Sequence, residues 1–100
     1  MKIYISGRIT GVENFEDRFK EAELKLRKEY PDAEIVNPII IGKEVEEQII
    51  NPTWNDYMRN CIKHLVECDS IYLLDDWKNS KGARLEYFIA SCLDYSFVEM

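Results

Sequence analysis

The stretch SIYLLDDWKNSKGARLE, residues 70–86, contains the pattern that decides the fold. Its first five residues, 70–74, form an apolar run without a charged side chain, which is typical of a strand that is covered on both faces. Ser80 then stands where a helix can begin, because a serine hydroxyl accepts a hydrogen bond from the first helical turn. The sequence therefore predicts a strand, a loop and a helix over residues 81–93, with a further short strand over residues 96–98.

The same alternation of strand and helix runs through the rest of the chain. Short apolar runs at residues 2–6 and 33–36 predict two more strands. Apolar residues that recur three and four apart predict helices over residues 15–30 and 54–67. Each of these helices follows a residue suited to cap it: Asn14 and Thr53.

Residues 39–52 fit neither pattern. Three isoleucines are followed by Gly42, which breaks the apolar run, and residues 44–48 are mostly acidic. We expect a long surface loop here with at most one helical turn, and long loops in small domains are often functional.

Strands that alternate with helices indicate an α/β fold. We expect a single domain over residues 1–100, a doubly wound parallel sheet of about four strands with helices on both faces, flavodoxin-like or Rossmann-like. Ligands of such sheets bind outside the carboxyl ends of the strands, where the strand order reverses. The loops at that end are residues 6–13, 37–52 and 75–80.

Composition excludes several classes of function. A net charge of −6 over 100 residues argues against binding to duplex nucleic acid. The chain has no apolar stretch of the roughly 20 residues that cross a bilayer, and its start does not resemble a signal peptide. Three cysteines without a CxxC pair indicate reduced thiols in a cytoplasmic protein. We expect no metal site, because His64 is the only histidine.

Two of the three site-end loops carry groups suited to an anion. Ser6, Gly7 and Arg8 combine a hydroxyl, a close backbone approach and a guanidinium fork. Residues 79–82, Asn-Ser-Lys-Gly, open a helix whose free N–H groups and dipole favour negative charge. The alternative is ordinary turn and capping chemistry. Neither loop matches the phosphate-binding or dinucleotide-binding glycine motifs, so we expect no ATP, NAD or other cofactor.

Glu86 lies on the last predicted helix among mostly apolar neighbours. A carboxylate in that setting is commonly exposed, or paired with a base such as Arg84 or Lys81. The other interpretation has Glu86 facing the ligand pocket, where a carboxylate could attack the anomeric carbon of a sugar. Tyr4, on the strand beneath, could donate the hydrogen bond that orients it, and we expect the two side chains within hydrogen-bond distance.

Three segments resemble a known family: KIYISGRITG (2–11), YMRNCIKHLVECDSIYLL (57–74) and NSKGARLE (79–86). They are similar to a DUF4406-like family of small phage and bacterial proteins. That family is in turn similar to the nucleoside 2-deoxyribosyltransferases and the deoxynucleoside 5'-monophosphate N-glycosidases. The resemblance implies an enzyme that cleaves or transfers the N-glycosidic bond of a (deoxy)nucleoside 5'-monophosphate.

The resemblance also implies roles for individual residues. Glu86 matches the glutamate nucleophile that forms the glycosyl-enzyme, and Tyr4 matches the tyrosine that positions it. Ser80 matches the serine with which the monophosphate hydrolases bind phosphate, where the transferases have an aspartate. Ser6, Gly7 and Arg8 match the region of the hydrolases' first phosphate loop. With the helix start and the loop before it, the expected substrate contacts are Ser6, Gly7, Arg8, Asp76, Asn79, Ser80, Lys81 and Gly82.

One position departs from the family pattern. Cys61 stands where the relatives have an aspartate that handles the leaving nucleobase. Asp56, Asp75 or Asp76 could take that role. The alternative is a binding module that holds a nucleotide or nucleotide-derived signal without cleaving it.

Two further expectations concern aromatic and apolar surfaces. Trp54 and Trp77 could stack on a base, or could instead cover the edge of the core. The helix over residues 81–93 is apolar around most of its circumference. Because monomers rarely expose such a surface, we expect a homodimer or higher homo-oligomer through this helix and the helix over residues 54–67, with the partner closing part of the pocket.

Overall fold

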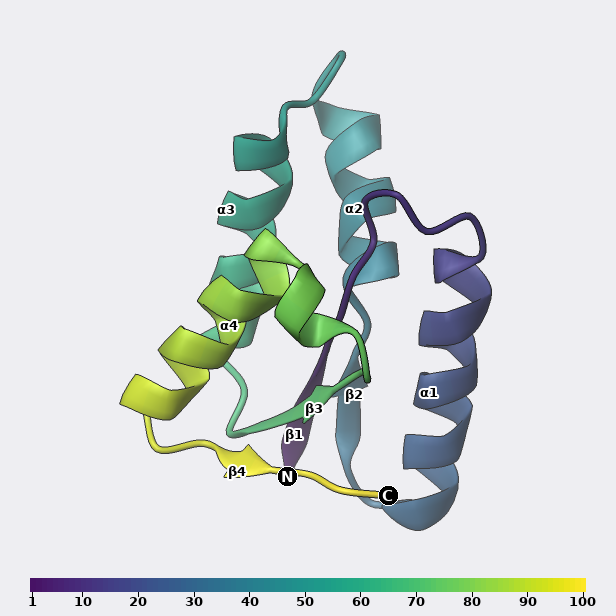
Figure 1. Cartoon of the computed structure of the whole chain (residues 1–100), viewed down its shortest axis with the longest axis vertical. Helices are drawn as coiled ribbons and strands as arrows, with labels where there is room; N and C mark the ends of the chain where they lie inside the picture. The colour runs from purple at the N-terminus through teal and green to yellow at the C-terminus, as the bar shows by residue number, and fades with distance from the viewer.

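A computed structural model describes all 100 residues and shows an α/β fold with a sheet of four parallel strands (Figure 1). The sheet confirms the predicted fold class. The strands, in chain order, are β1 Lys2–Ser6, β2 Glu34–Val36, β3 Ser70–Leu73 and β4 Ser96–Phe97. The helices are α1 Phe15–Glu29, α2 Pro38–Gln48, α3 Trp54–Leu65, the short 3-10 helix η1 Trp77–Asn79, and α4 Lys81–Cys92.

The strand order β2-β1-β3-β4 sets the position of the site. The chain moves from β1 to β2 on one side and then returns to place β3 on the other side of β1. The order therefore reverses between β1 and β3, and a ligand crevice is expected beyond the carboxyl ends of these two strands. Their register pairs Tyr4 with Ile71 and Ser6 with Leu73.

Helices cover both faces of the sheet because successive side chains of β1 point to opposite faces. Ile3 and Ile5 pack in one core cluster with Phe19 of α1. Tyr4 packs in a second cluster with residues of α2, α3 and α4, among them Leu65 and Ala90. Figure 1 shows α1 on one side of the strands and α4 on the other.

Helix α2 corrects one prediction. Residues 38–48 form a regular helix where the sequence analysis expected a surface loop. The Asn37 side chain accepts a hydrogen bond from the backbone N–H of Ile39 (3.0 Å), and Pro38 occupies the first turn, where its missing N–H costs nothing. Ile41 and Val45, four apart, are buried. Their burial outweighs the helix-breaking tendency of Gly42, which is about 1 kcal/mol.

The three helices begin where they were predicted, and two of the three predicted caps make their side-chain hydrogen bonds. Thr53 and Asp56 form a reciprocal capping box at α3, and Ser80 Oγ accepts from the N–H of Ala83 (3.1 Å) at α4. The prediction for Asn14 is wrong, because its side chain makes no capping hydrogen bond. Its ψ of 31° lies outside the extended region from which a capping side chain reaches back to the helix. No helix of the chain is long and apolar enough to cross a membrane.

Candidate functional site

A cavity of about 300 Å³ lies at the carboxyl end of β1, the strand at which the strand order reverses. Its walls come from β1 and the segment after it, from the first turn of α1, from one side of α2, from one side of α3, and from the first turns of α4. Gly7 lines it at the end of β1. A Cβ atom at that position would lie only 2.7 Å from Leu74 Cδ1, so only glycine allows the ends of β1 and β3 to approach this closely.

Glu86 lines the cavity from the second turn of α4 and is only 5% exposed. The Tyr4 hydroxyl donates to Glu86 Oε2 (2.5 Å), and the Ser6 hydroxyl donates to Oε1 (2.7 Å). The predicted contact between Tyr4 and Glu86 is therefore confirmed. The other interpretation of Glu86, exposure or an ion pair with Arg84 or Lys81, is wrong, because the residue is buried and has hydroxyl partners.

The surroundings of Glu86 change its acid–base behaviour. Burial raises the pKa of Glu86 from its usual 4.5 to about 7, against the opposing effect of the hydrogen bonds from Tyr4 and Ser6. Burial, with the nearby Glu86 charge, raises the pKa of Tyr4 well above its usual value. The same two causes raise the pKa of Cys61 to about 11. Glu86 is therefore the one group of this cluster that exchanges a proton near neutral pH.

The N-terminal turn of α4 forms another part of the wall. Ser80, Gly82 and Ala83 line the cavity there. Because Ser80 Oγ uses a lone pair to accept from Ala83, its hydroxyl hydrogen is free to point elsewhere. The predicted site residues that meet around the cavity are Tyr4, Gly7, Ser80, Gly82 and Glu86.

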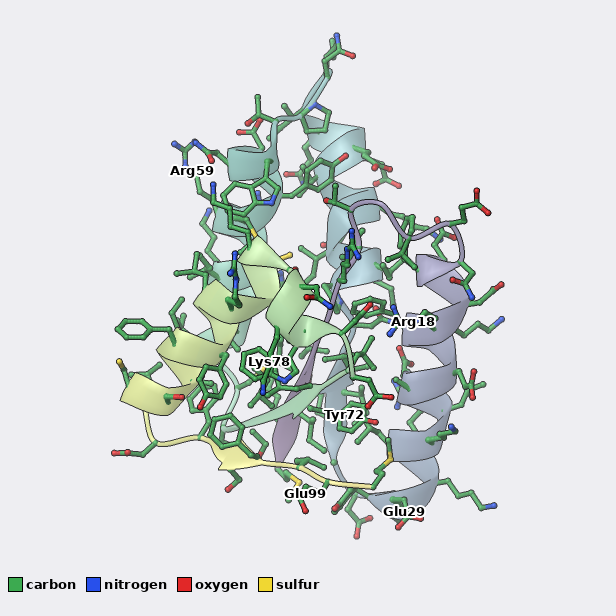
Figure 2. The ribbon with its side chains drawn as sticks, viewed as in Figure 1. Arg18, Glu29, Arg59, Tyr72, Lys78 and Glu99 are labelled. Carbon is green, nitrogen blue, oxygen red and sulfur yellow. The ribbon has the colours of Figure 1, made fainter.

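Three other predicted substrate contacts have hydrogen-bond partners inside the protein: Ser6, Arg8 and Asp76. Ser6 is fully buried behind Glu86, and Arg8 Nε donates to the carbonyl of Thr10 (3.2 Å). Asp76 accepts from the backbone N–H of Arg8 (3.3 Å) and from Arg18 Nη1 (2.6 Å). The Arg18 hydrogen bond holds the pKa of Asp76 below its usual value. Arg18, labelled in Figure 2, thus ties α1 to the loop after β3 and fixes the segment that follows β1.

Asn79, Lys81 and Trp77, near the start of α4, do not line the cavity. Asn79 and Lys81 are exposed, and Lys81 Nζ lies 4.5 Å from the centre of the Trp54 ring. Trp54 lines the cavity. Trp77 does not line it, and stacks instead on Tyr87 with 4.5 Å between ring centres.

The three aspartates considered as substitutes for the missing acid do not line the cavity. Asp56 is held in the capping box with Thr53, Asp76 pairs with Arg18, and Asp75 is exposed. The carboxylates that do line the cavity, besides Glu86, are Glu16 of α1 and Glu46 of α2.

Residues 37–52 were expected at this end of the sheet, but four lining residues of α2 and α3 were not identified from the sequence. Lys43 and Glu46 of α2 and Tyr57 and Met58 of α3 all line the cavity. The spacing of the lining residues of α2 could have revealed this wall. Pro38, Gly42 and Glu46 are four apart and therefore share one side of a helix. This pattern was hidden by the expectation of a loop over residues 39–52.

Comparison with known proteins identifies a family. The family model described as "Domain of unknown function (DUF4406)" matches residues 1–98. No curated protein matches the chain. The matched range includes all four strands, all of the helices and every residue of the cavity wall.

Proposed function

The chain belongs to the DUF4406 family, and we propose that it is a nucleotide N-glycosidase or nucleoside 2-deoxyribosyltransferase-like enzyme. Its substrate is a (deoxy)nucleoside 5'-monophosphate. One observation carries the proposal: a buried carboxylate, Glu86, faces a cavity and is held through both oxygens by the hydroxyls of Tyr4 and Ser6. The cavity volume of about 300 Å³ lies at the lower end of the range for small-molecule sites.

Glu86 acts as the nucleophile in this mechanism. An ionised carboxylate has about four lone-pair positions, so each Glu86 oxygen keeps one free beside its hydrogen bond. One oxygen forms a bond to C1' of the sugar while the bond from C1' to the base nitrogen breaks. The base leaves with that electron pair and takes up a proton. The transition state resembles an oxocarbenium ion, which the adjacent negative charge stabilises.

A second displacement completes the reaction. Water attacks C1' in a hydrolase, or a second base does so in a transferase, and the bond from C1' to Glu86 breaks. The carboxylate is thereby regenerated, and the proton lost by the attacking water goes to solvent. Tyr4 and Ser6 orient the Glu86 side chain, and their hydroxyl donors favour the ionised carboxylate that attacks in the first step and leaves in the second.

The 5'-phosphate binds where α4 begins. The Ser80 hydroxyl and the backbone of Gly82 line the cavity at this helix N-terminus, which attracts anions through its free N–H groups and its dipole. Gly7 allows a close backbone approach from the other side. Lys43 adds a positive charge to the cavity wall.

Nucleotide turnover is the first expected result. Incubation with a panel of nucleoside 5'-monophosphates is expected to release free base from at least one of them, as measured by chromatography. The matching nucleosides, which lack the phosphate, are the control and are expected to react more slowly. Release from none of the monophosphates at high enzyme concentration would count against catalysis.

A non-catalytic nucleotide-binding module is the second candidate. It is favoured by Cys61, which lines the cavity as a thiol with a pKa of about 11. The enzymes that the sequence resembles have an acid at this position. Ligand that binds the native state raises its stability by RT ln(1 + [L]/Kd). A nucleotide that raises the melting temperature without being cleaved would favour this candidate.

The cellular setting and the assembly are also part of the proposal. All three cysteines are free, which supports a reducing, cytoplasmic setting. Apolar side chains remain exposed on α4, at its C-terminus and at the end of α3: Leu85, Phe88, Leu93 and Val66. A homodimer through α3 and α4 would bury them and close part of the cavity.

Light scattering tests the assembly. We expect a mass of about twice the 11.9 kDa of one chain at tens of micromolar protein. Phe88, which is 64% exposed, is expected to lie in the interface, so Phe88→Ser should shift the mass toward the monomer because burial of its ring is lost. A monomer mass for the unaltered chain would contradict the dimer.

A further inference from the structure

We propose that the pair formed by Glu46 and Tyr57 reads the edge of the nucleobase and selects bases that carry an exocyclic amino group. The inference rests on the proposed function, because it requires a nucleotide whose sugar lies at Glu86. It assigns a role to lining residues of α2 and α3 that were not identified from the sequence, and it supplies a base-recognition element at a different place from Cys61.

The two side chains meet across the gap between α2 and α3. The Tyr57 hydroxyl donates to Glu46 Oε2 over 2.8 Å, and both residues line the cavity. Tyr57 lies one turn before Cys61 on α3, about 6 Å along the helix axis. Cys61 interacts electrostatically with both Tyr4 and Glu86: it raises the pKa of Tyr4, and the charge of Glu86 raises the pKa of Cys61. The pair and Glu86 thus line the same cavity, with Cys61 one helical turn from Tyr57 and next to the reactive carboxylate.

The same walls leave room for a flat group. Gly42 lines the cavity from α2, one turn before Glu46. A Cβ atom at Gly42 would lie 3.7 Å from Tyr57 Cε1, in ordinary contact, so a longer side chain would occupy the space beside this ring. Trp54 and Met58 line the cavity from α3 on the same side as Tyr57. Aromatic rings beside an open slot provide the stacking surface that nucleobases use.

The hydrogen-bond pattern of the pair determines what it can recognise. The proton of the Tyr57 hydroxyl is engaged by Glu46, and this hydrogen bond raises the pKa of Tyr57, so the hydroxyl stays protonated. An ionised carboxylate offers acceptors only. The pair therefore presents acceptors to the cavity, which suits the two N–H donors of an amino group. A carbonyl oxygen at the same position would face these acceptors and be rejected.

Two pairs of nucleotides test this directly. Cytosine and uracil differ by an amino group against a carbonyl at one ring position and by an acceptor against an N–H donor at the neighbouring ring nitrogen, and adenine and hypoxanthine differ in the same way. The comparison therefore tests recognition at the position of the amino group, where uracil and hypoxanthine offer no donor. We expect kcat/KM for dCMP to exceed that for dUMP, and that for dAMP to exceed that for dIMP, in each case by about tenfold or more, as for a hydrogen bond to a charged group. If the protein binds without turnover, the same ratio is expected in Kd.

Variants identify the residues responsible. Glu46→Gln and Tyr57→Phe are expected to reduce the amino-to-carbonyl ratio toward one. Glu47→Gln is the matched control, because Glu47 is an exposed neighbour on α2 that does not line the cavity, and it should keep the ratio of the unaltered protein. Glu46 is itself exposed, so its replacement is expected to leave the melting temperature unchanged.

The outcomes separate this inference from the proposed function. A nucleotide that is bound or cleaved without an amino preference, or a preference that persists in Glu46→Gln, would overturn the role of the pair and leave the glycosidase proposal standing. Failure of every nucleotide to bind or react would overturn the proposed function and this inference together. An amino preference that is lost in Glu46→Gln and kept in Glu47→Gln supports the inference.

Discussion

Glu86→Gln is expected to lower kcat for base release by a factor of about 10³ or more, with nucleotide affinity changed only slightly. Removing a nucleophile abolishes the covalent route, whereas glutamine keeps the size of the side chain and one acceptor for the hydroxyls of Tyr4 and Ser6. The measurement is kcat and KM for the best nucleotide of the panel. Glu47→Gln, the same substitution on the surface of α2, should retain full activity.

The pattern of the two kinetic constants makes this test specific. A loss in kcat with KM preserved indicates an interaction made in the transition state. Base release by Glu86→Gln at close to the rate of the unaltered protein would show that Glu86 does not act as the nucleophile, whatever its geometry.

The second large effect is on stability. The folded state raises the pKa of Glu86 from 4.5 to about 7, so it binds the proton more tightly than the unfolded state does. The stabilisation from this proton is fully present below about pH 4.5 and is lost as the pH rises through about 7. The contribution of Glu86 to the free energy of unfolding is therefore expected to fall by about 2–3 kcal/mol between about pH 5 and about pH 8.

Urea unfolding of matched variants isolates this contribution. Glutamine does not titrate, so Glu86→Gln should lose the fall in stability over this pH range, while Glu47→Gln should follow the unaltered protein. Activity is expected to move in the opposite direction, because the ionised nucleophile becomes populated as the pH rises through about 7. A parallel pH dependence for the unaltered protein and Glu86→Gln would contradict the raised pKa.

The parts of the site that follow from periodicity could be predicted from sequence. Successive side chains of β1 point to opposite faces of the sheet, so every second one faces α4. Tyr4 is one of these, and its hydroxyl therefore reaches Glu86. The same rule places Ser6, two residues later, on the same face. Ser6 was predicted to contact phosphate because it borders the loop after β1. It is the last residue of the strand, and its hydroxyl donates to Glu86 instead.

Other parts of the site depend on partners that no local pattern reveals. Asp76 pairs with Arg18, 58 residues earlier in the chain, so the sequence around Asp76 could not show that its carboxylate is already engaged. Helix α2 was missed because Gly42 lowers helix propensity and the helix depends on tertiary contacts of Ile41 and Val45. With α2 assigned to a loop, the meeting of Glu46 and Tyr57 could not be foreseen.

Detection of the covalent intermediate tests the central claim most directly. A covalent mechanism leaves sugar phosphate attached to the enzyme during turnover, and an acid quench preserves the ester for intact-mass measurement and peptide mapping. We predict a mass increase equal to the sugar phosphate, on the peptide that contains Glu86, and its absence in Glu86→Gln. Base release with no such adduct on the protein, or with the adduct on a different residue, would contradict the role of Glu86 as nucleophile.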